Sequence, residues 1–180
     1  LEPAGCFDFH IAGNYLKDRR PNETVYYMHS SSEPAQEFNN SGRLVERCYG
    51  ENDITTALGA GAWTASAAEL CRLVAAIDGD PTMPDVISPE AVRLMTQEMP
   101  DHQYSLGWNY TPNGRPWIRT GSLVGTSAIV LRYPDGECWV FITNTSTWKG
   151  HKFSKDTMAL FEKLRKRFGS KLPKRNLFVK

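Results

Sequence analysis

The sequence predicts an α+β fold, an antiparallel sheet with flanking helices. Two apolar runs, residues 127–133 and 138–143, are separated by Pro134-Asp135-Gly136-Glu137, a segment with hairpin-turn chemistry. Two helix start signals stand before these runs and an apolar pattern of helical period follows them. We therefore expect a sheet of three to five strands, with the last helix packed on one face and residues outside this sequence covering the other.

The first helix signal is a capping box formed by Ser66 and Glu69. The apolar residues behind it fall on one helical face and end before Gly79; they are Leu70, Leu73, Val74 and Ile77. The second signal is Ser88-Pro89-Glu90, with proline at the first helical position. This helix should end near Glu98 and carry Val92, Leu94 and Met95.

The terminal helix should open near Ser154 and end at Gly169. Its spacing predicts a buried face made of Met158, Phe161, Leu164 and Phe168. Short aromatic-rich strands are predicted at residues 104–110 and 116–120, on either side of Pro112-Asn113-Gly114. The runs 127–133 and 138–143 should be central strands covered on both faces.

The chain divides into three parts by pattern. Residues 1–58 are polar and irregular, which predicts long loops with a short strand at residues 24–27. Residues 59–168 hold the helices and strands described above, and residues 169–180 form a basic tail that we expect to be loosely held. With 180 residues, 41% of them hydrophobic, the chain can bury one core.

Several classes of protein are disfavoured by composition. No apolar run reaches the roughly 18 residues of a membrane span, and no signal sequence follows Leu1, which is not an initiator methionine. The four cysteines lack Cys-x-x-Cys spacing; Cys71 and Cys138 lie in apolar patterns and are expected to be small core residues. The histidines, at positions 10, 29, 102 and 151, stand singly, so we predict no metal and no cofactor.

The net charge of +1 hides a division along the chain. From Lys149 onward eleven Lys or Arg residues stand against Asp156 and Glu162, so the rest of the chain is acidic. A basic tail can bind nucleic acid or an anionic surface. Because no aromatic residues are interleaved with these charges, we interpret them as the solvated face of a terminal helix and expect no nucleic-acid partner.

The segment Arg119-Thr120-Gly121-Ser122 carries the chemistry of the chain. It precedes the apolar run Ala128-Ile129-Val130-Leu131 and combines a cation, a hydroxyl and a glycine whose backbone a ligand can approach. These groups suit an anionic or oxyanionic ligand. The alternative is that Arg119 is simply a solvent-facing cation on an edge strand.

This segment resembles the Lys-Thr-Gly motif of penicillin-binding proteins and serine β-lactamases. Further segments resemble the same superfamily in its order, in particular its class C-like branch: residues 59–70, Leu106-Gly107-Trp108, and residues 139–144. The resemblance implies the C-terminal portion of a β-lactamase/transpeptidase-like fold. It also implies that Ser122 lends its backbone N–H to an oxyanion hole, while Arg119, Thr120, Gly121 and Asn144 bind a substrate carboxylate. Asn144 has a plain strand-end turn as its alternative.

The superfamily's Ser-x-x-Lys and Tyr-x-Asn motifs are not found upstream of this region. Ser146-Thr147-Trp148-Lys149 has the right letters but stands after the Arg-Thr-Gly segment, so we interpret it as a coincidence. We therefore expect a fragment of a periplasmic or secreted serine hydrolase that is inactive alone and acts on a carboxylate-bearing small molecule or peptide. Its partner would be the missing N-terminal part, or a second copy. The alternative is a non-catalytic binding module from a dead relative.

Overall fold

The structure, a computed structural model, describes residues 1–98, 104–150, 152–174 and 176–178. Within these residues the fold is α+β, with three α-helices and small antiparallel sheets. The helices are α1 (Ala67–Ala75), α2 (Pro89–Thr96) and α3 (Lys152–Phe168). The main sheet contains β5 (Trp117–Leu123), β6 (Thr126–Arg132) and β7 (Cys138–Thr143).

The remaining elements are short. Two-residue strands form two small antiparallel pairs, β1 (His10–Ile11) with β4 (Trp63–Thr64) and β2 (Ala35–Gln36) with β3 (Leu44–Val45). Single 3-10 turns are η1 (Glu2–Ala4), η2 (Leu16–Asp18), η3 (Ile54–Thr56) and η4 (Gly169–Lys171). No helix among the described residues is long and apolar enough to cross a membrane.

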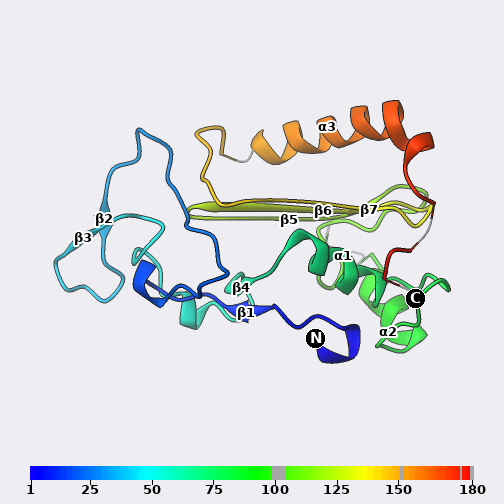
Figure 1. The fold of residues 1–180 in the computed structure, drawn as a ribbon, viewed down its shortest axis with the longest axis horizontal. Coiled ribbons are helices and arrows are strands. Elements are labelled where there is room, and N and C mark those ends of the chain that lie inside the picture. The colour runs from blue at the N-terminus through cyan, green and yellow to red at the C-terminus, as the bar shows by residue number, and fades with distance from the viewer. Residues whose placement is uncertain (99–103, 151, 175, 179–180) are drawn as a thin grey trace.

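Helices cover both faces of the main sheet (Figure 1). Successive side chains of a strand point to opposite faces. On β6, Ile129 and Leu131 pack with Phe161 of α3, whereas Val130 packs with Val74 of α1. The expectation that one face needs residues from outside this sequence is therefore wrong, because α1 supplies the second layer.

The strand order is β5-β6-β7, with β6 in the middle. The long hairpin of β6 and β7 is confirmed, and its register places Ser127 opposite Thr143 and Arg132 opposite Cys138. Only β6 is a central strand. β7 has helices over both faces but forms an edge of the sheet, so its prediction as a central strand is wrong.

The helix caps follow the predicted chemistry in part. The Ser66 and Ser88 hydroxyls accept the N–H groups of Glu69 and Ala91, three residues on. The second half of the Ser66 capping box does not form. Instead, Glu69 Oε1 accepts the backbone N–H groups of Phe7 and Asp8, at 2.8 and 3.0 Å, which ties the N-terminal segment to α1.

Two predicted strands are absent as regular strands. Residues 104–110 contain only isolated bridges, Ser105 with Trp108 and Tyr110 with Ile118. Residues 24–27 contain a single bridge between Tyr27 and Thr145. Conversely, β5 runs on to Leu123 rather than ending at Thr120. Tertiary packing of the aromatic residues, such as Trp108 against Trp117 at 5.6 Å, holds the 104–110 segment without a ladder.

The terminal helix is longer than predicted, and of its predicted inner side chains only Phe168 is exposed. α3 begins at Lys152, and Thr157 and Phe161 are buried. Met158 packs against the same cluster as Phe161, whereas Phe168, which was predicted to face inward, is exposed. Phe168 is the last residue of α3.

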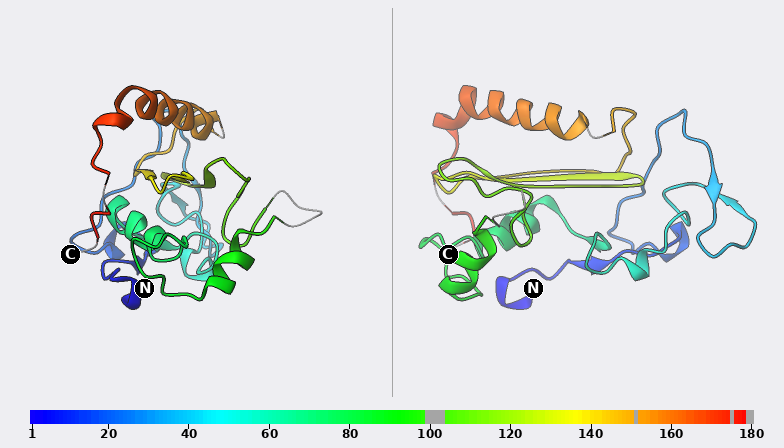
Figure 2. Two further views of the ribbon diagram at one scale, coloured as in Figure 1. Left: turned by 90° about the vertical axis from the view of Figure 1, so that its right-hand side faces the viewer. Right: turned by 180° about the vertical axis from the view of Figure 1, so that it is seen from behind.

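The parts of the chain are joined more closely than their sequence patterns indicate. β1 pairs with β4 across the predicted boundary at residue 58, with His10 opposite Thr64. The segment with β2 and β3 projects beyond the end of the main sheet (Figure 2). In the described part of the tail, the guanidinium of Arg72 lies 4.6 Å from the centre of the Phe178 ring, so this end packs on α1 rather than hanging free.

Candidate functional site

The Arg119-Thr120-Gly121-Ser122 segment lies on β5, an edge strand of the main sheet that residues 109–110 cover in part. The N–H groups of Ile118 and Thr120 point away from β6, because they donate to Tyr110 O at 2.8 Å and to Asn109 Oδ1 at 2.6 Å. Backbone direction alternates along an antiparallel strand. The N–H of Ser122 therefore points out of the same edge, and no residue described in the structure accepts it.

Arg119 lies on the same strand, three residues before Ser122, and its side chain leaves one face of the sheet. It is opposite Val130, so its side chain leaves β5 on the face that α1 covers, while Thr120 and Ser122 leave on the α3 face. Arg119 is exposed, and in the described ranges no carboxylate pairs with it. The edge thus presents a cation and an outward N–H three residues apart.

Thr120 is held by a residue that the sequence analysis did not select. Asn109 Oδ1 accepts both the N–H of Thr120 and, at 3.4 Å, its hydroxyl. This leaves the Thr120 hydroxyl directed at Asn109 rather than at open solvent. Asn109 directly follows the Leu106-Gly107-Trp108 motif, and that position was the signal in the sequence that could have identified it.

Gly121 keeps the edge accessible. A Cβ placed on Gly121 would meet no other heavy atom within 4 Å, so the space beside its backbone is open to a ligand. The Ser122 side chain does not point out of the edge as its N–H does. Its Oγ lies 3.2 Å from Ser127 Oγ on the neighbouring strand β6. Its hydroxyl therefore braces the hairpin, and only its backbone is available at the edge.

Asn144 does not join this group of residues. It follows β7, which β6 separates from β5, so about 10 Å of sheet width lies between them. Its side-chain Nδ2 donates to Val25 O at 2.7 Å, and its backbone carbonyl accepts the N–H of Tyr27. These bonds serve the strand-end turn that was the alternative for Asn144, and its role as a ligand contact stays a prediction.

The histidines and cysteines form no metal centre in the described part of the chain. His10 is buried, with Nδ1 2.9 Å from Asp8 O and Nε2 3.3 Å from Glu23 Oε2. His29 lies beside Ser31, while His102 and His151 lie outside the described residues. Each described histidine is thus accounted for by its local hydrogen bonds.

Two cysteines meet where α1 packs on β7. The pKa of Cys138 is raised by its hydrogen bond with Cys71 and by burial, and the same bond lowers the pKa of Cys71. Both are free thiols, as are Cys6 and Cys48. Cys138 packs with Val74, Trp108 and Val130, which fits the prediction of a small residue within the core.

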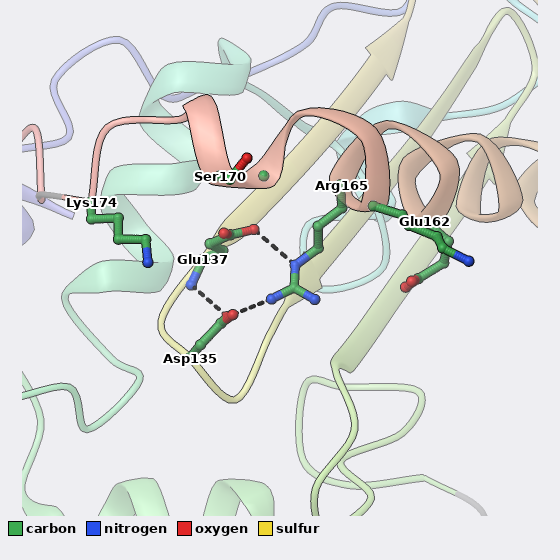
Figure 3. Close-up of a pocket in the computed structure, with 8 residues that line it drawn as sticks. Asp135, Glu137, Glu162, Arg165, Ser170 and Lys174 are labelled. Atoms are coloured by element: carbon green, nitrogen blue, oxygen red, sulfur yellow. Dashed lines mark hydrogen bonds and ion pairs between the residues drawn. The ribbon is translucent and has the colours of Figure 1, made fainter.

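A hollow lies elsewhere, between α3 and the β6–β7 turn (Figure 3). Its volume is about 550 Å³, and its charged lining residues are Asp135, Glu137, Glu162, Arg165, Lys166 and Lys174. Arg165 donates to Asp135 and, at 2.8 Å, to Glu137, while the Tyr133 hydroxyl donates to Glu162 at 2.8 Å. The contacts of Arg165 with Asp135 and Glu137 therefore tie α3 to the β6–β7 turn.

No family model, curated protein or solved structure matches this chain. The geometry of the β5 edge offers one outward backbone donor, one exposed cation and an open glycine, which together can bind a carboxylate or stabilise an oxyanion.

Proposed function

We propose that the β5 edge is the oxyanion and carboxylate-binding rim of a β-lactamase-related serine hydrolase, whose nucleophile and base are supplied by residues outside this sequence. The observation that carries the proposal is the outward N–H of Ser122 beside the exposed Arg119. This is the arrangement that acyl transfer needs at the carbonyl oxygen of its substrate. The resemblance to the superfamily supports an exported enzyme.

Each group of the edge has a separate task in this proposal. When a serine attacks an ester or amide carbonyl, the oxygen becomes negative, and the Ser122 N–H donates a hydrogen bond to it. Arg119 holds the substrate carboxylate as a planar bidentate donor. Because arginine stays protonated at ordinary pH, Arg119 takes no part in proton transfer. The substrate class is an ester, a D-amino-acid peptide or a β-lactam that carries a carboxylate.

A binding test on this chain uses the Ser122 position, because proline removes the N–H and alanine keeps it. The N–H of Ser122 lies outside the β5–β6 ladder, so Ser122→Pro should keep the sheet, as edge strands tolerate proline there. Titration with N-acetyl-D-alanine, followed by backbone NMR, should shift the amides of residues 119–122. Ser122→Ala should bind as the original chain does, and Ser122→Pro should bind more weakly.

Arg119 gives the second arm of the test. Arg119→Ala should weaken carboxylate binding about 30-fold, the equivalent of about 2 kcal/mol for a charge-assisted pair. Arg119→Lys should recover part of this loss, since it keeps the charge without the planar fork. In the intact hydrolase the Ala variant should lose about 30- to 1000-fold in kcat/KM. Unchanged binding in both the Arg119→Ala and Ser122→Pro variants would remove the proposal.

The chain by itself should show no turnover of a chromogenic cephalosporin or a p-nitrophenyl ester above the buffer rate. Without a serine activated by a base, acyl transfer has no covalent route. Turnover that persists through purification and disappears in Ser122→Ala would contradict the proposal that the nucleophile comes from residues outside this sequence.

A non-catalytic binding module is the second candidate, and the engagement of the Thr120 hydroxyl by Asn109 favours it. In such a module Arg119 binds a peptide carboxylate and no acyl group is transferred. A fluorophosphonate probe applied to the protein that contains this chain separates the two. Covalent labelling of a serine supports the hydrolase, and its absence with carboxylate binding intact supports the module.

A further inference from the structure

α3 covers the main sheet with one side and turns its opposite side to solvent (Figures 1 and 2). Thr157 and Phe161 face the sheet. At 3.6 residues per turn the opposite side contains eight residues, all of them exposed. They are Lys152, Lys155, Asp156, Ala159, Glu162, Lys163, Lys166 and Arg167.

This outer face is strongly basic. It carries five cations against two carboxylates, Asp156, which pairs with Lys149 Nζ at 2.5 Å, and Glu162, which accepts the Tyr133 hydroxyl at 2.8 Å. In the described ranges none of the five cations is paired with a carboxylate of the chain. Arg165 differs, because its side chain turns inward to Asp135 and Glu137. Because no ion pair among the described residues uses these five cations, their charges are available to an anionic partner, while the Arg167 guanidinium also lies 5.1 Å from the centre of the Phe168 ring.

Large apolar side chains flank the same face. Leu160, on the side of α3, is 52% exposed, and Trp148, in the loop that leads into α3, is 78% exposed. Phe168 and Leu172, at the other end of the helix, are each 37% exposed. The loop rises beside the start of α3 to the level of the helix (Figure 1). Trp148 at the start of α3 and Leu160 on its flank therefore place exposed apolar side chains beside the basic face.

We propose that the outer face of α3, with Trp148 and Leu160, docks on a membrane surface rich in anionic lipid headgroups. Cations near such a surface are attracted to it, while aromatic and aliphatic side chains at its rim enter the headgroup region. The inner side of α3 stays packed on the sheet, so the docking is peripheral. This inference is independent of the function proposed for the β5 edge.

The apolar residues favour a bilayer over a nucleic acid. Phosphate groups of either partner attract Lys and Arg, but only the bilayer offers an apolar layer below its phosphates in which Leu160 and Trp148 can be buried. The sequence pattern alone placed these cations on a solvated helix face. It did not show that Leu160 and Trp148 are exposed beside them.

The test is co-sedimentation of the full chain with phosphatidylcholine vesicles, with and without about a third phosphatidylglycerol. We expect binding to the anionic vesicles only, with release at about 1 M salt, where the Debye length falls to about 3 Å. Each cation near the surface contributes about fivefold to binding, from about 1 kcal/mol apiece. The triple variant Lys155→Gln, Lys163→Gln, Lys166→Gln should therefore bind about 100-fold more weakly.

A matched control removes three exposed cations elsewhere, Lys17→Gln, Arg20→Gln and Arg115→Gln, and should bind as the original chain does. Leu160→Ser, which leaves the charge unchanged, should also weaken binding. A blue shift of tryptophan emission on binding should be lost in Trp148→Phe. Equal losses in the two triple variants, unaltered binding of Leu160→Ser, or tighter binding to duplex DNA than to the anionic vesicles would overturn the proposal.

Discussion

Glu37 shows how one buried side chain can organise a segment that has little regular structure. Only 2% of Glu37 is exposed, and its carboxylate accepts the hydroxyls of Ser41 and of Tyr15, the latter at 2.9 Å. Arg43 adds an ion pair at 3.6 Å. The hydrogen bonds from Ser41 and Tyr15 hold the pKa of Glu37 below its ordinary value. The bond between Tyr15 and Glu37 in turn raises the pKa of the Tyr15 hydroxyl. These contacts connect three stretches of the loop-rich segment.

The lowered pKa of Glu37 predicts a pH dependence of stability. A carboxyl group whose pKa is lower in the folded chain stabilises the fold above its unfolded pKa, about 4.5, and that stability is lost as the pH falls through the folded pKa. The free energy of unfolding of Glu37→Gln should therefore be below that of the original chain at pH 7. The difference should shrink towards pH 3. Urea unfolding at a series of pH values measures it, and a difference independent of pH would contradict the assignment.

At the scale of the element, α3 is held by the face that contacts the sheet. Phe161 is 8% exposed, and its ring lies 5.3 Å from that of Trp139. Its neighbour Leu160 points away and is 52% exposed. The two adjacent positions therefore test whether the helix is oriented as described, because alanine, a strong helix former, replaces both residues.

Phe161→Ala should lower the free energy of unfolding by about 3 to 5 kcal/mol, because it leaves a cavity in the core between α3 and the sheet. Leu160→Ala should change it by about 0.5 kcal/mol or less, as surface substitutions do. Chemical denaturation of both variants measures the contrast. Similar losses at the two positions would show that α3 packs through a different face.

Elements specified by local chemistry were predictable from the sequence, and elements specified by tertiary contacts were not. The Ser66 and Ser88 caps and the turn at residues 134–137 act within a few residues, so their patterns predict the elements. Glu69 lies within a capping-box pattern, yet its carboxylate binds a segment about sixty residues away. The candidate site divides in the same way. The motif indicated Arg119 and Thr120, whereas the contact by which Asn109 holds Thr120 joins residues eleven apart and was not predictable from local pattern.

At the scale of the whole molecule, the main sheet is covered on its faces but open at its β7 edge. The pairs Ser127 with Thr143 and Ile129 with Phe141 share hydrogen bonds within the sheet, so the N–H groups of Val140 and Ile142 point outward. Further along the same edge, Tyr27 pairs with Thr145 in parallel. In the described residues no backbone group meets Val140 or Ile142. An open strand edge is a template for pairing with another strand.

We therefore expect the chain to self-associate through β7 at high concentration, with light scattering showing a mass above that of the monomer. Ile142→Pro removes the outward N–H without breaking the β6–β7 ladder, so it should shift the chain to monomer. Ile142→Ala is the matched control: it shortens the same side chain but keeps the N–H, and it should still associate. Circular dichroism of both variants establishes that the fold persists. A strict monomer for the original chain, or equal dissociation of the two variants, would show that the β7 edge does not pair and that the partner expected from the sequence binds elsewhere.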